Sequence, residues 1–65
     1  MYSVYVIYSS GYNRRYTGLT KDVEKRVRQH NAGENKSTKH YTPWKLILIE
    51  LFESREEARR KRKNI

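Results

Sequence analysis

The pattern of apolar and polar residues divides the chain into alternating strands and helices. Residues 2–8 are β-branched or aromatic with one serine among them, and they predict a strand. Turn-forming residues at 9–13 then predict a hairpin into a second strand at 14–19. Residues 44–52 are the most apolar stretch and are apolar on both faces, which predicts a third strand that is central or covered.

Two helices are expected, one after the hairpin and one at the end of the chain. Thr20 is a suitable N-cap for a helix over 21–31, which an Asn-Ala-Gly sequence would end before a polar loop with room for one helical turn. Ser54 and Glu57 have the spacing of a capping box, in which each side chain bonds the other residue's backbone N–H. A last helix is therefore expected to begin near Arg55.

The resulting order, β-β-α-β-α, predicts an α/β (α+β) fold. We expect a small three-stranded antiparallel sheet in the order 2-1-3, flanked by helices, and a single domain over residues 1–65. The last helix is almost free of apolar side chains after residue 58 and so has little to bury. We therefore expect either that its end frays or that the domain is truncated there and continues further.

The charge of the chain favours a polyanionic partner. Fifteen Lys and Arg residues against seven Asp and Glu residues give a net charge of +8. Basic side chains neutralise phosphates and release condensed counterions, although such a charge is also compatible with solubility alone. The absence of cysteine excludes disulfides, zinc thiolates and a thiol nucleophile. Neither a membrane-spanning run nor a signal peptide is evident, so a cytoplasmic protein is expected.

Four residues form a candidate chemical site. Tyr5 and Tyr16 fall on the two adjacent strands of the hairpin, and Arg26 and His30 fall one turn apart on the first helix. At about 100° per residue, Arg26 and His30 border the apolar stripe that faces the sheet. Polar groups there are costly unless partnered, and a phosphate would partner both. Gly18, within the second strand, suggests a bulge or a close approach by another group.

These residues also carry a family resemblance. Ser3-Val4-Tyr5 and Tyr16-Thr17-Gly18 resemble the two triplets that name the GIY-YIG nuclease superfamily. The segment from Tyr16 to Gly33 is similar to that of small stand-alone bacterial GIY-YIG proteins, which are related to the N-terminal nuclease domain of excinuclease. The resemblance covers nearly the whole chain. It implies metal-assisted hydrolysis of a DNA phosphodiester and a link to DNA repair.

The resemblance implies a role for each residue of the site. Tyr5 or Tyr16 would orient or deprotonate the attacking water, and Arg26 would clamp the scissile phosphate. His30 would be a general base or a phosphate contact, and Gly18 would allow tight packing beneath the site. Further substrate contacts are expected from three basic residues, namely Arg28, Lys39 and His40.

The chain departs from the family pattern at the metal. The resemblance implies a divalent cation, Mg²⁺, held by a glutamate of the last helix at position 62, where this chain has Arg62. Glu57 is the remaining candidate ligand, although the capping box already accounts for it. Two hypotheses stay open: a DNA endonuclease domain, inactive in this form or not, and a non-catalytic DNA- or RNA-binding module. A ribosomal or scaffold protein would explain the charge but not the Tyr–Arg–His spacing.

Overall fold

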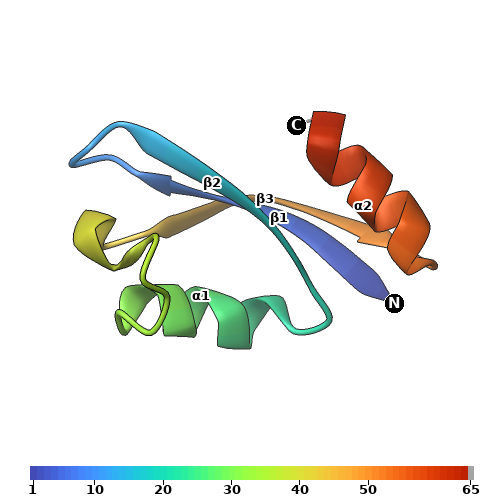
Figure 1. The fold of residues 1–65 in the computed structure, drawn as a ribbon, viewed down its shortest axis with the longest axis horizontal. Coiled ribbons are helices and arrows are strands. Elements are labelled where there is room, and N and C mark those ends of the chain that lie inside the picture. Colours follow the sequence, from blue (N-terminus) through green and yellow to red (C-terminus); the bar gives the residue numbers. More distant parts are fainter. Residues whose placement is uncertain (65) are drawn as a thin grey trace.

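A computed structural model describes residues 1–64 of the chain (Figure 1). The predicted order β-β-α-β-α and the mixed α/β class are confirmed, and one short 3₁₀ helix lies in the loop after the first helix. The elements are β1 (Tyr2–Ser9), β2 (Arg14–Thr20), α1 (Val23–Asn31), η1 (Lys39–Tyr41), β3 (Lys45–Phe52) and α2 (Arg55–Asn64). None of the helices in this described part of the chain is long and apolar enough to cross a membrane.

The sheet is antiparallel and has β1 at its centre. Its strand order is β2-β1-β3, as the sequence predicted. Tyr5 of β1 lies opposite Gly18 of β2 and Ile49 of β3, and a register shift between Val6 and Ile7 marks an irregularity against β3. Because side chains alternate along a strand, Tyr5 and Ile7 point to one face of the sheet and Val6 to the other.

The two helices cover opposite faces of the sheet. Figure 1 shows α1 below the strands and α2 above them, beside the start of β1 and the end of β3. Tyr5, Ile7 and Trp44 form a buried cluster, against which Val23 and Val27 of α1 pack. Each face of β1 is therefore shielded from water.

The start of α1 differs from the prediction. Thr20 is not the N-cap, because it still pairs with Ser3 as the last residue of β2. Asp22 caps the helix instead, and its carboxylate accepts a hydrogen bond of 3.2 Å from the backbone N–H of Lys25. The Thr20 hydroxyl accepts from the backbone N–H of Asp22 at 3.1 Å, so it shapes the turn before the helix.

α2 begins where predicted, and the Ser54 half of the predicted capping box is confirmed. The Ser54 hydroxyl accepts a hydrogen bond of 3.1 Å from the backbone N–H of Glu57, and the helix begins at Arg55. Among the described side chains of this helix, that of Ala58 is the buried one. The helix has few apolar side chains, and it correspondingly buries little.

The prediction that the third strand is central or covered is wrong. It begins at Lys45 rather than Trp44 and forms an edge of the sheet. Four of its apolar side chains are 41% to 62% exposed, namely those of Ile47, Leu48, Ile49 and Leu51. Apolar content alone indicates what a strand could bury, whereas burial also requires a covering element. Both helices contact the central strand β1 most, so much of the edge strand β3 is left open.

Candidate active site

The structure brings together four residues that the sequence singled out. The Tyr5 hydroxyl of β1 lies 2.9 Å from Nε2 of His30 on α1. The ring of Tyr16, on β2, has its centroid 4.9 Å from that of His30 and 6.4 Å from that of Tyr5. Arg26 lies one turn before His30 on the same helix and is partly buried. Three separate elements thus contribute to one cluster.

The hydrogen bonds of His30 determine which of its nitrogens carries the proton. Its side chain is 1% exposed, and Nδ1 lies 2.8 Å from the hydroxyl oxygen of Thr38. The Thr38 hydroxyl donates to the backbone carbonyl of Asn35 at 3.5 Å, so its oxygen is left to accept the proton of Nδ1–H. A neutral His30 then presents a lone pair on Nε2, which accepts the hydrogen bond from Tyr5. The hydrogen bonds therefore run in one direction: Tyr5 donates to His30, His30 donates to Thr38, and Thr38 donates to the carbonyl of Asn35.

The surroundings of Tyr5 and His30 keep both side chains uncharged. Burial raises the pKa of Tyr5 above its ordinary value, and Arg26 opposes the rise only in part, as a donor and a positive charge. Burial also lowers the pKa of His30, and the charge of Arg26 acts in the same direction. At neutral pH the pair is therefore a phenol and a neutral imidazole.

Gly18 is required by the position of the Tyr5 ring. A Cβ atom at Gly18 would overlap the ring and the hydroxyl of Tyr5, with Cε1 at 2.7 Å. The sequence suggested either a bulge or a close approach here, and the structure has the close approach. The ring of Tyr5 crosses the neighbouring strand at the one residue that has no side chain, and this directs its hydroxyl toward His30.

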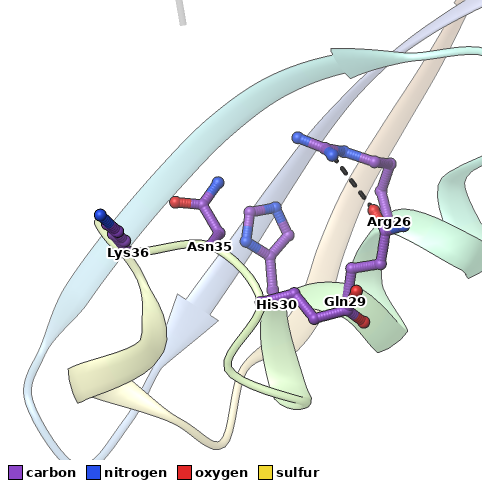
Figure 2. A pocket seen from close by; sticks show the side chains of 6 residues that line it. Arg26, Gln29, His30, Asn35 and Lys36 are labelled. Atoms are coloured by element: carbon purple, nitrogen blue, oxygen red, sulfur yellow. Dashed lines mark hydrogen bonds between the residues drawn. The ribbon is translucent and has the colours of Figure 1, made fainter.

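Beside His30 lies a polar pocket of about 410 Å³ (Figure 2). The Arg26 side chain extends toward the His30 ring, and one of its terminal nitrogens donates to the Gln29 side chain at 3.1 Å. A guanidinium has five N–H donors, so this single bond leaves others for an anion in the pocket. The lining residues are Arg26, Gln29, His30, Glu34, Asn35 and Lys36.

The other residues predicted to contact substrate lie apart from this cluster. Arg28, Lys39 and His40 are all exposed, the first on α1 and the other two on η1, and none of them lines the pocket beside His30. Glu57, the candidate metal ligand, lines a separate pocket with Phe52, Arg60 and Lys61. The structure therefore does not bring these four residues together with Tyr5.

The described residues do not fit a bound divalent cation. Residues 1–64 contain no group of three or more His, Cys, Asp or Glu side chains arranged to hold a metal. Glu34 is the single carboxylate residue among the pocket's lining residues. Arg26 lies beside Tyr5, and the charge of Arg62 is also close enough to lower the pKa of Tyr5. Mg²⁺ prefers carboxylate and other oxygen ligands, and two nearby positive charges oppose its binding.

Sequence reasoning missed the residues that fix His30 and Trp44 in place through hydrogen bonds. Thr38 is 1% exposed and receives the indole N–H of Trp44 at its backbone carbonyl, 2.9 Å away. The Asn31 side chain accepts from the backbone N–H of Trp44 at 2.6 Å and donates to its carbonyl at 3.1 Å. The sequence marks Asn31 only as part of a helix stop. A polar residue at the last position of a helix carries no periodic signal for such contacts.

The chain belongs to the GIY-YIG family, since the family model described as the GIY-YIG catalytic domain matches residues 1–64. A UPF0213 protein of Halobacterium salinarum is 47% identical over 62 residues, which cover 94% of this chain and 79% of the relative. A UPF0213 protein of Haloquadratum walsbyi is 54% identical over 44 residues, or 66% of this chain. The matched part spans about half of that relative, 49% of its length. No solved structure matches the chain significantly.

Proposed function

We propose that residues 1–65 form a single domain that binds DNA and hydrolyses one of its phosphodiester bonds, with Tyr5, His30 and Arg26 as the acting residues. The observation that carries this proposal is the hydrogen bond of 2.9 Å between the Tyr5 hydroxyl and a buried, neutral His30. Family membership supports a nuclease, and the net charge of +8 supports a nucleic-acid partner. A role in DNA repair is part of the same proposal, and the resemblance to the excinuclease domain supports it.

The pairing of Tyr5 with His30 gives the phenol a route for its proton. A phenol with a raised pKa does not ionise in neutral water, so Tyr5 alone is a poor base. Tyr5 is fully buried and does not line the pocket, so the step requires the bound substrate to uncover its hydroxyl. With Nε2 of His30 as acceptor, the Tyr5 oxygen then takes a proton from the attacking water while its own proton passes to His30. The imidazolium that forms keeps its hydrogen bond to Thr38. The hydroxide oxygen then forms the new bond to phosphorus, and the bond to the leaving oxygen breaks with its electron pair going to that oxygen. The leaving oxygen takes a proton from solvent water, and the imidazolium of His30 returns its extra proton to solvent through Tyr5.

Arg26 is suited to hold the phosphate during this step. Its guanidinium lies beside the Tyr5 hydroxyl and lines the polar pocket next to His30. Guanidinium groups bind phosphate oxygens through two parallel hydrogen bonds and stabilise the charge that develops on them. Lys36, which lines the same pocket, adds a second positive charge for the strand.

A non-catalytic DNA- or RNA-binding module on the same fold is the second candidate function. It is favoured by the chemistry around Tyr5, where the described residues offer positive charge rather than a carboxylate set for a metal. A divalent ion stabilises the transition state of phosphodiester hydrolysis by several kcal/mol. A domain of this kind would keep the basic face and Arg26 but cut DNA poorly or not at all.

Paired measurements of binding and cleavage decide between these functions. Nicking of supercoiled plasmid in Mg²⁺, with protein in excess, is compared for the unmodified protein, Arg26→Ala and Arg28→Ala. Arg28 is the matched control because it lies on the same helix but is exposed. We expect slow nicking that Arg26→Ala abolishes and Arg28→Ala retains, with DNA affinity little changed in both. Equal nicking by the two variants contradicts the role of Arg26, and binding without any nicking favours the second candidate.

A further inference from the structure

A second pocket of about 410 Å³ lies next to residues that contact His30. Tyr16, which contacts the His30 ring, and Thr38, which bonds His30 Nδ1, both line it. The pocket therefore adjoins the candidate active site through these two residues. Its lining residues include Arg14, Arg15, Tyr16, Thr38, Tyr41 and Trp44.

The chemistry of this pocket is aromatic and cationic. The guanidinium carbon of Arg14 lies 4.5 Å from the centroid of the Tyr41 ring. The Tyr41 ring in turn meets the ring of Trp44 at 6.4 Å in an edge-on arrangement. Aromatic rings and guanidinium planes are the surfaces on which proteins stack unpaired nucleobases. Neighbouring basic residues, here Arg14 and Arg15, suit the phosphates that accompany such a base.

The floor of the pocket is already fixed in place. Trp44 is 6% exposed, and its indole N–H donates to the Thr38 carbonyl. Asn31 bonds both the N–H and the carbonyl of the Trp44 backbone. A ligand that enters therefore meets ordered side chains and incurs little cost to arrange them. The volume also lies within the range of about 300–1,000 Å³ that is usual for small-ligand sites.

We propose that this pocket holds one unpaired base of the DNA strand, next to the phosphate bound by Arg26; this rests on the proposed function. In a duplex both faces of a base are covered by its neighbours, so only an unstacked base can lie against Tyr16 or Tyr41. Extracting a base costs least where it is already unpaired. The substrate class that follows is duplex DNA with a bulged or otherwise unpaired nucleotide beside the cleavage position.

The test compares two short duplexes, one fully paired and one with a single bulged 2-aminopurine, each with an end label for fluorescence anisotropy. We expect the bulged duplex to bind about tenfold more tightly, since stacking of one base on an aromatic residue contributes about 1–3 kcal/mol. Stacking in the pocket should also quench the 2-aminopurine fluorescence. Tyr41→Leu should abolish both the preference and the quenching while keeping the affinity for the paired duplex, and Tyr41→Phe should keep all three.

Tyr2→Leu is the matched control. Tyr2 also carries a cation over its ring, with Lys21 Nζ 5.1 Å from the centroid, but it does not line the pocket. This variant should keep the preference for the bulged duplex. If Tyr41→Leu does not fold, as judged by circular dichroism, Arg14→Gln replaces it, because Arg14 is exposed and stacks on Tyr41. Arg14→Gln should then reduce the preference.

The outcomes separate this inference from the function on which it rests. Equal affinity of the unmodified protein for both duplexes, or a preference that survives in folded Tyr41→Leu, or in Arg14→Gln where that variant replaces it, overturns the assignment of the pocket and leaves the proposed function standing. Failure to bind either duplex at low salt overturns both.

Discussion

The substitution Gly18→Ala tests the geometry of the site most sharply. Gly18 lies under the ring of Tyr5, which is completely buried, and an added Cβ would overlap that ring. The ring cannot tilt away freely, because Tyr16 and His30 lie against it with centroids at 6.4 Å and 5.9 Å. The variant must therefore shift Tyr5 or separate the two strands, and either change lengthens the hydrogen bond to His30.

The expected loss of stability is large for a chain of this size. Overpacking a core typically costs about 1–3 kcal/mol. Leaving the buried Nε2 of His30 without its partner costs about 1–3 kcal/mol more. The sum, about 2–6 kcal/mol, compares with a total of about 3–10 kcal/mol expected for 65 residues. Gly18→Ala should therefore lower the free energy of unfolding by about a fifth or more.

Urea unfolding followed by circular dichroism measures this loss. Gly11→Ala is the control, because a Cβ at Gly11 would meet nothing within 4 Å and should change stability little. The cost of Gly18→Ala should also shrink in a Tyr5→Leu background, where the ring is absent, so the two changes should be strongly non-additive. A Gly18→Ala protein that unfolds at the unmodified midpoint, or whose cost is the same with and without the Tyr5 ring, would refute the packing argument.

Three further predictions follow from charge and protonation. DNA affinity should fall steeply with salt, with a log–log slope of about −0.9 per phosphate contact on duplex DNA, and salt-independent binding would contradict a phosphate partner. Arg62→Glu should raise Mg²⁺-dependent plasmid nicking, because a carboxylate would replace a positive charge near Tyr5; robust nicking by the unmodified protein would argue against this. His30 has a lowered pKa when folded, so its contribution to stability is present above its ordinary value of 6.5 and is lost as pH falls through the lowered value. Urea unfolding over this acidic range should show a fall in the free energy of unfolding. The same fall should be seen in the control variant His40→Gln, because His30 is unchanged there.

The site residues could be predicted because local patterns fix their positions. The turn between β1 and β2 sets the hairpin, and helical periodicity puts Arg26 and His30 on the side of α1 that faces it. The same periodicity indicated that these polar groups would need partners, and Tyr5 is the partner of His30. Gly18 was recognisable because a glycine within a strand usually marks a bulge or a close approach.

Long-range packing could not be predicted in the same way. Thr38 and Trp44 meet only because the loop between α1 and β3 folds back, and that loop has no periodic pattern. Asp22 rather than Thr20 caps α1, because both are good caps and the end of sheet pairing decides between them. The exposure of β3 depends on where the helices lie over the sheet, which the apolar content of residues 44–52 does not encode.

The central claim, that Tyr5 transfers a proton in DNA hydrolysis, is tested most directly by Tyr5→Phe. Single-turnover cleavage of end-labelled DNA in Mg²⁺, with protein in excess, is measured beside Tyr8→Phe, which removes a hydroxyl that donates to Asn13 on the exposed surface. Tyr5→Phe should bind DNA as the unmodified protein does and cleave about 10²–10⁴ times more slowly, while Tyr8→Phe should cleave at the unmodified rate. Cleavage by folded Tyr5→Phe at the unmodified rate would contradict the account.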